Sequence, residues 1–132
     1  MKFLICLTFF VGCSEPAAGD CAAEDDALVA CYPLYPPTFS EIHTRTLQPS
    51  CALGGGACHA QEGRQGGLDL STEASAWQGL VTEGRVVPGS PGCSVLIDHI
   101  DAHGRALMPP GAQLPEATRC SLRQWVGQGA ER

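Results

Sequence analysis

The sequence predicts a mainly α fold, in which about four short helices and long loops rich in glycine and proline form one small domain. Apolar residues recur at helical spacing in four segments, each preceded by a helix-start signal. No segment shows a convincing strand alternation, and residues 85–87 come nearest to one. The length of 132 residues allows a single domain, and many of the 16 glycines and 10 prolines lie between the helical segments.

The first helix is predicted over about 38–48. It begins at a capping box, because the Thr38 hydroxyl and the Glu41 carboxylate can each accept a bond from a free backbone amide of the first turn. It ends before Pro49, since proline cannot continue a regular helix. Its expected apolar face is made of Phe39, Ile42 and Leu47.

The other three helices are predicted from their starts and their apolar faces. Ser71 caps the second, and Ser90–Pro91 opens the third, because proline at the first helical position gives up only an amide that has no partner. The fourth begins near Pro115 and ends at Gly127. The expected buried faces are Trp77, Leu80 and Val81 in the second helix, Cys93, Leu96, Ile97 and Ile100 in the third, and Leu122, Trp125 and Val126 in the fourth.

The chain begins with a short basic and apolar stretch that is typical of a secretory signal. The apolar run over 3–11 is too short for a membrane-spanning helix, which needs about 20 residues. Residues 10–14 (Phe-Val-Gly-Cys-Ser) resemble the lipobox of bacterial lipoproteins, in which the cysteine becomes the lipidated first residue. We therefore expect residues 1–12 to be a lipoprotein signal peptide and Cys13 to be the lipidation site, with ordinary cleavage and a free Cys13 as the alternative.

Residues 13–37 are expected to form an acidic, proline-rich tether, and residues 38–132 to form the domain. Without the signal peptide, the chain has 7 arginines against 14 acidic residues, and this balance argues against nucleic-acid binding. The sequence has no nucleophile-elbow motif and no well-supported acid–base pair of carboxylates. A hydrolase is not indicated, and we do not expect an enzyme.

Six cysteines remain beside Cys13, and an even number in an exported chain indicates that all are used covalently, in disulfides or in cofactor attachment. Cys120 lies well away from the apolar face of the fourth helix, so a disulfide with Cys93 explains it better than burial in the core. Cys21 and Cys31 are expected to form another disulfide.

The segment Cys51-Ala-Leu-Gly-Gly-Gly-Ala-Cys58-His59 follows the logic of covalent haem attachment, in which thiols add to haem vinyl groups and the adjacent imidazole binds the iron. Two residues usually separate the cysteines, whereas six do here, and the glycines give the longer loop freedom to fold back. Downstream, Met108 lies in Leu-Met-Pro-Pro-Gly and is the one methionine left after the signal. A thioether in a proline-fixed loop suits the second axial position of a haem iron, and a core methionine is the alternative.

These pieces and their order resemble a class I cytochrome c domain from about Phe39 to Ala130, similar to those in exported lipoproteins of myxobacteria and planctomycetes. The matching segments are 39–42, 47–51, 58–59, 66–70, 85–91, 108–109, 125–126 and 129–130. The resemblance implies that the first and last helices cross beside a haem. It further implies haem c held by Cys51 and Cys58, with His59 as the proximal ligand and Met108 as the distal one.

The resemblance implies a lipid-anchored c-type cytochrome that carries single electrons. We expect an exported protein held by Cys13 on the periplasmic face of the cytoplasmic membrane or on the outer membrane of a Gram-negative bacterium. Basic redox proteins are its expected partners, steered by its acidic surface, and the chain is expected to be a monomer. The alternative is a haem-free, disulfide-stapled lipoprotein domain with a structural or interaction role, in which Cys51 bonds to Cys58.

Other histidines and cysteines permit other sites. His43 is expected on the solvated face of the first helix, while His99 and His103 are four apart and could bind a metal, although histidines near a helix end usually suit its dipole. His43 or His99 is a substitute distal ligand should Met108 lie elsewhere. A zinc site is less favoured, because structural zinc usually takes two closely spaced ligand pairs. That site would use Cys58, His59, Cys93 and Cys120.

Overall fold

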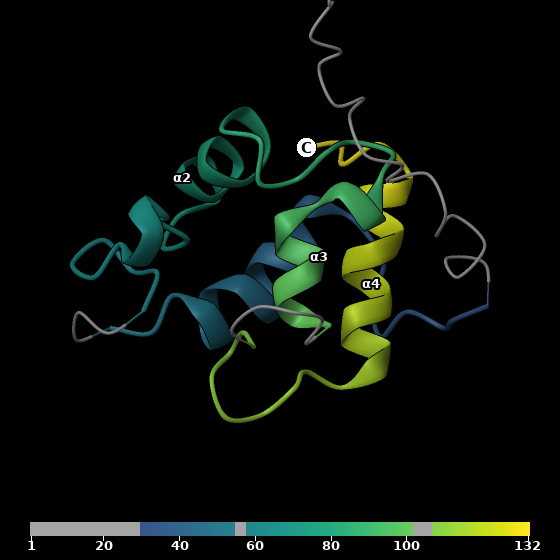
Figure 1. Ribbon diagram of the computed structural model, residues 1–132, viewed down its shortest axis with the longest axis horizontal. Helices are drawn as coiled ribbons and strands as arrows, with labels where there is room; N and C mark the ends of the chain where they lie inside the picture. Colours follow the sequence, from purple (N-terminus) through teal and green to yellow (C-terminus); the bar gives the residue numbers. More distant parts are fainter. Residues whose placement is uncertain (1–29, 55–57, 102–106) are drawn as a thin grey trace, which may run out of the picture.

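The computed structural model describes residues 30–54, 58–101 and 107–132, and in these residues it is mainly helical with no strand, as the sequence predicts (Figure 1). Labels in η mark 3₁₀ and π-helices, and labels in α mark α-helices. The elements in chain order are α1 (Phe39–Ile42), η2 (His43–Cys51), η3 (Gln65–Gly67), α2 (Glu73–Trp77), η4 (Gln78–Thr82), η5 (Pro91–Cys93), α3 (Val95–Ile100) and α4 (Glu116–Gly127).

The first helix runs three residues further than predicted, because it changes from α1 into the π-helix η2 and continues past Pro49 to Cys51. Proline has no N–H to donate, but the wider π turn carries the chain past it, with the Ala52 N–H donating to the Leu47 carbonyl at 2.9 Å. The predicted capping box is half formed. The Thr38 hydroxyl accepts from the Glu41 N–H, whereas the Glu41 carboxylate pairs with Arg45 one turn later.

The second and third helices begin later than their predicted starts. Thr72, one residue after Ser71, forms a reciprocal capping box with Ser75 and starts α2, which η4 extends. Ser90–Pro91 opens the 3₁₀ turn η5, and α3 starts only after Ser94. Ser94 interrupts the helix because its backbone is extended and its hydroxyl bonds to the backbone of residues 87 and 90.

Helices from both ends of the chain meet in the core. Phe39 of α1 is fully buried, and its ring lies 5.0 Å from Trp77 and 5.3 Å from Trp125 of α4 between centroids. Leu122 and Val126 are fully buried on the same face of α4, as predicted. Figure 1 shows α3 beside α4, and these two helices are in contact. No helix in the described part of the chain is long and apolar enough to cross a membrane.

The segment before α1 is fastened along α4. Cys31 is disulfide-bonded to Cys120, the Leu34 N–H donates to the Ala117 carbonyl at 2.9 Å, and Tyr35 is buried in the core. The disulfide closes a span of 89 residues, which in the chain-entropy account stabilises the fold by about 4.6 kcal/mol. This stretch of the predicted tether is therefore packed on the domain.

The predicted disulfide pairing is wrong. Cys120 bonds to Cys31, and this bond contradicts both of the expected disulfides, Cys93–Cys120 and Cys21–Cys31. Cys93 is itself disulfide-bonded, and Cys21 lies outside the described residues together with Cys13 and the signal peptide. Because Cys93 and Cys120 are both committed to disulfides, the zinc site that would have used them is also excluded.

Candidate functional site

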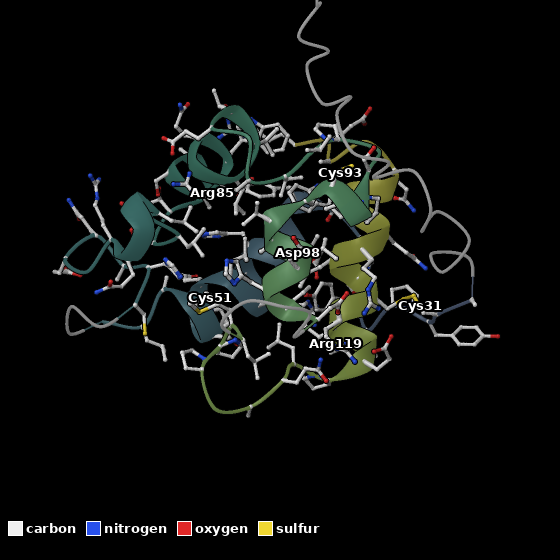
Figure 2. The ribbon with its side chains drawn as sticks, in the orientation of Figure 1. Cys31, Cys51, Arg85, Cys93, Asp98 and Arg119 are labelled. Atoms are coloured by element: carbon white, nitrogen blue, oxygen red, sulfur yellow. A yellow bond between two sulfur atoms is a disulfide. The ribbon has the colours of Figure 1, made fainter. Side chains whose placement is uncertain are left out.

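A cavity of about 330 Å³ lies among η2, η3, η4, α3 and the segment that carries Met108. Cys51, His59 and Met108 all line it, so the structure brings together three of the four residues expected to serve a haem. Figure 2 shows Cys51 and Arg85, another residue of the wall, on the same side of α3. Most of the remaining wall is apolar and comes from Leu47, Leu68, Leu70, Leu80, Val95, Leu96 and Ile100.

The backbone around His59 fixes that residue at both of its peptide groups. Its N–H donates to the Cys51 carbonyl at 3.0 Å, and its carbonyl accepts from the Leu70 N–H at 2.7 Å. The side chain adds a third bond, because Nδ1 lies 2.9 Å from the Gln65 carbonyl oxygen. A carbonyl can only accept, so this bond requires a proton on Nδ1, and in the neutral imidazole Nε2 then keeps its lone pair for a metal.

Met108 reaches the cavity from a different part of the chain, 49 residues after His59. Its backbone N–H donates to the His99 carbonyl at 2.9 Å, which attaches this segment to α3. Its half-buried side chain lines the cavity instead of filling a gap in the core. An imidazole and a thioether that line one cavity form the donor pair that the sequence predicts for an axially ligated iron.

The two cysteines of the motif are both free thiols. Cys51 lies on the cavity wall, and burial raises the pKa of its thiol to about 11, with a further contribution from the charge of Cys58. That contribution means the two sulfur atoms are near enough to interact electrostatically. Cys58 is half-buried and precedes His59, but it is not part of the described cavity wall.

The structure separates the other histidines. His43 is buried, contrary to the solvated position expected for it, because Nε2 lies 3.1 Å from the Leu70 carbonyl and the ring packs near Phe39. It does not line the cavity and is therefore no substitute ligand. His99 does line the cavity, beside Met108, whereas His103 lies outside the described residues.

Arg85 is a residue of the cavity wall that the sequence analysis did not identify as functional. Its side chain is 27% exposed and donates to two backbone carbonyls, those of Gly66 at 2.9 Å and Gly79 at 2.7 Å. In the sequence, residues 85–87 are the nearest approach to a strand and belong to the segment 85–91 of the cytochrome c resemblance, whereas in the structure Val86 is buried in a helix-to-helix connection. Nothing in that pattern indicates that the arginine turns back toward two earlier turns.

Comparison with known families supports a cytochrome c-like domain. The family model described as Planctomycete cytochrome C matches residues 56–111. This range contains Cys58, His59 and Met108 and begins after Cys51. No curated protein and no solved structure matches the chain. In the described residues, no three His, Cys, Asp or Glu side chains come together as a site for a bare metal ion.

Proposed function

We propose that this protein is a lipid-anchored c-type cytochrome, which binds haem and carries single electrons without acting on a substrate of its own. The observation that carries the proposal is that His59 and Met108 line one apolar cavity, with the Nδ1–H of His59 already bonded to a carbonyl. A metal-bound histidine almost always donates its other N–H in this way. The match to a cytochrome family over both residues supports the same function.

The residues of the cavity fit a haem in chemical type. His59 Nε2 and the Met108 thioether would be the axial ligands, and bound haem would supply reversible one-electron chemistry with a potential raised by the methionine. The leucines of the wall would exclude water from the iron, which also favours the less charged state and a higher potential. The volume of about 330 Å³ is at the lower end of the usual range for cofactor pockets.

Covalent attachment is the second part of the proposal. Cys51 lies on the cavity wall and Cys58 is next to His59, so these two thiols are the ones that would hold haem c. Thioether formation adds the S–H across a vinyl C=C, and it needs neither an oxidant nor a leaving group. The raised pKa of Cys51 means that this thiol is protonated at neutral pH, and burial keeps it from casual oxidation.

Lipidation at Cys13, export and an acidic surface that steers basic redox proteins complete the proposed setting. A monomer with one haem would present the open side of the cavity to such a partner. Labelling of the full chain with a radioactive fatty acid in a Gram-negative host, with Cys13→Ala as control, tests the anchor. Label that persists in the Cys13→Ala variant would overturn it.

The function itself is tested by expressing the full chain in a host with cytochrome c maturation machinery and recording the visible spectrum after denaturation. Haem that stays with the unfolded polypeptide is the expected result. The matched controls are the same chain in a host without that machinery and a Cys51→Ser/Cys58→Ser variant, both of which should yield haem that is lost on denaturation. Absence of haem from the wild-type chain would overturn the proposal.

One observation favours a second function. Cys51 and Cys58 are near enough for the charge of one to affect the pKa of the other, and a disulfide between them is the bond that a haem-free, stapled domain with a structural or interaction role would use. Mass spectrometry under non-reducing conditions distinguishes the two. A haem-free chain with a Cys51–Cys58 bond would replace the cytochrome proposal with this one.

A further inference from the structure

Arg85 joins two separate turns beside the cavity. Its Nη2 donates to the Gly66 carbonyl of η3 at 2.9 Å, and its Nη1 donates to the Gly79 carbonyl of η4 at 2.7 Å. Nη1 also pairs with the Glu83 carboxylate at 2.6 Å. Figure 2 labels Arg85 above Cys51 on the cavity side of α3. A planar guanidinium is suited to this task because its donors are held in a fixed fork.

The turn that Arg85 holds is the one that orients His59. The Gln65 carbonyl accepts the Nδ1–H of His59 at 2.9 Å, and Gly66 is the next residue along the chain. The Gln65 and Gly66 carbonyls belong to consecutive peptide units that meet at the Gly66 Cα, and His59 bonds to the first carbonyl while Arg85 bonds to the second.

The backbone of this turn holds Gln65 by long bonds, although the Gly67 N–H donates to the Arg64 carbonyl at 2.8 Å. Gly66 and Gly67 have φ angles of +64° and +74°, in the left-handed region that glycine enters freely and leaves as freely. The bonds within the turn include long ones, with 3.3 Å from the Leu68 N–H to the Gln65 carbonyl and 3.4 Å from the Gln65 N–H to the Cys58 carbonyl. The half-buried guanidinium of Arg85 makes one shorter bond to this turn, at Gly66, and another to Gly79, and so ties the turn to η4.

We infer that Arg85 is a positioning residue for His59. Its hydrogen bond to the Gly66 carbonyl fixes the neighbouring Gln65 carbonyl, and the Gln65 carbonyl in turn fixes the tautomer and the ring orientation of His59. The effect of Arg85 on the binding of a metal by His59 rests on the proposed haem function. Outer-shell partners of metal-binding histidines commonly change metal affinity by about 10–100-fold when they are replaced. Arg85 is an outer-shell partner of this kind, because its bond to Gly66 and the His59 bond to Gln65 are joined through the backbone of Gly66.

Three variants of the full chain test the inference. Arg85→Gln removes the fork and the charge, and Arg85→Lys keeps the charge but cannot reach both carbonyls with a planar fork. Arg64→Gln is the matched control, because Arg64 is 59% exposed in the same turn and contacts Asp69 without bonding to a carbonyl. Far-UV circular dichroism checks folding, and Arg85→Lys decides the question should Arg85→Gln unfold.

Two measurements on the haem-free chain give the readout. Nitrogen-15 NMR of the imidazole reports the tautomer of His59, and titration with haemin reports its affinity for the iron porphyrin. We expect wild type and Arg64→Gln to hold the Nδ1–H tautomer, and both Arg85 variants to give a mixture and to bind haemin about tenfold more weakly.

The outcomes separate the inference from the proposed function. An unchanged tautomer and haemin affinity in the Arg85 variants would overturn the inference, as would Arg85→Lys behaving like wild type, since charge alone would then suffice. A wild-type chain that does not bind haemin would contradict the haem function, while the tautomer shift between wild type and Arg85→Gln would still support the positioning role.

Discussion

The two sides of the cavity are held in different ways. On the His59 side, the three bonds of that residue run to Cys51, Gln65 and Leu70, all within 11 residues along the chain. On the Met108 side, the Met108 N–H bonds to the His99 carbonyl, and arginines of α4 bond to residues before and after Met108. The first side is therefore built locally, whereas the second depends on contacts between distant parts of the chain.

The support from α4 is a group of ion pairs around Asp101, the residue that follows α3. The Asp101 carboxylate, 9% exposed, accepts from Arg119 Nη1 and Arg123 Nε, each at 2.9 Å. Arg119 also donates from Nε to the Leu114 carbonyl at 3.1 Å, beyond Met108. Arg119 thus binds both Asp101, at the end of α3, and Leu114, which follows Met108 in the chain.

The largest expected contrast is between the two ligands. His59→Ala should abolish the normal axial coordination of the haem, even where thioethers still hold it, because the local side provides the proximal donor. Met108→Ala should retain the haem with a lower reduction potential, because water or His99 is a poorer stabiliser of the ferrous state than a thioether. Visible spectra and redox titration measure both.

The control for this contrast is His43→Gln, which replaces a histidine that does not line the cavity and whose Nε2 bonds to the Leu70 carbonyl. It should keep the haem spectrum and the potential of the wild type. Equal potentials in Met108→Ala and wild type would remove Met108 from the ligand set. A normal axial spectrum in His59→Ala would do the same for His59.

The second expected effect is on stability and lies on the Met108 side. Asp101→Asn removes the more buried of the two carboxylates that Arg119 and Arg123 share, the other being that of Glu116, and we expect it to lower the free energy of unfolding by about 2 kcal/mol in urea titrations. The Met108 amide should exchange faster with deuterium, because the end of α3 is released from α4. The amide of Leu70, on the local side, should be affected less.

Arg45→Gln is the matched control for this prediction. Arg45 pairs with Glu41 on an exposed helix face, and such a pair contributes less than about 0.5 kcal/mol. A loss of stability as large as that of Asp101→Asn would mean that ion pairs contribute alike wherever they lie. Unchanged exchange at Met108 in Asp101→Asn would show that the α4 contacts do not support this segment.

The third effect concerns the thiol on the cavity wall. Because burial raises the pKa of Cys51 to about 11 from an ordinary 9.0, alkylation by iodoacetamide at pH 8 should be about 100-fold slower than for an ordinary thiol. Because the Cys51 thiol is deprotonated at a higher pH in the folded state than in the unfolded state, the free energy of unfolding should fall as the pH rises from about 9 to 11. Mass spectrometry after timed alkylation measures the rate.

The Cys58→Ser variant sharpens this prediction. Burial is the main cause of the raised pKa of Cys51, and the charge of Cys58 is the lesser one, so removing Cys58 should speed alkylation of Cys51 only modestly. A Cys51 that reacts like an exposed thiol in either chain would mean that the cavity wall is open at this position.

The same contrast between local and distant contacts decides what the sequence could predict. The helices are predicted from caps and apolar faces, which are local signals. The adjacency of Cys58 and His59 is also a local signal. The presence of Met108 in the candidate site was predictable, because it is the sole methionine of the expected mature chain and lies among prolines. Each of these signals is contained within a few residues.

The Cys31–Cys120 bond was not predictable, because cysteine parity allows many pairings and the segment before α1 had no helical signal to place it along α4. The passage of the first helix beyond Pro49 depends on a π turn, which has no clear sequence pattern. The roles of Arg85 and Asp101 depend on which carbonyls and arginines the fold brings near them, and neighbouring residues carry no sign of that.

The smallest expected effect tests the end of the local side, where Asp69 precedes Leu70. The Ser71 hydroxyl and backbone N–H both donate to the Asp69 carboxylate and lower its pKa, and Arg64 lowers it further. A carboxyl whose pKa is lowered on folding stabilises the protein above its unfolded pKa, and that contribution is lost as the pH falls through the folded value. Ser71→Ala should therefore raise the pKa of Asp69, measured by carbon-13 NMR, and flatten the acid limb of the stability curve. Ser40→Ala, on α1, should leave both unchanged.

The His59 tautomer should survive Ser71→Ala, because the bonds to Cys51, Gln65 and Leu70 remain. A tautomer shift would mean that the local side is a single cooperative unit instead of three separate bonds.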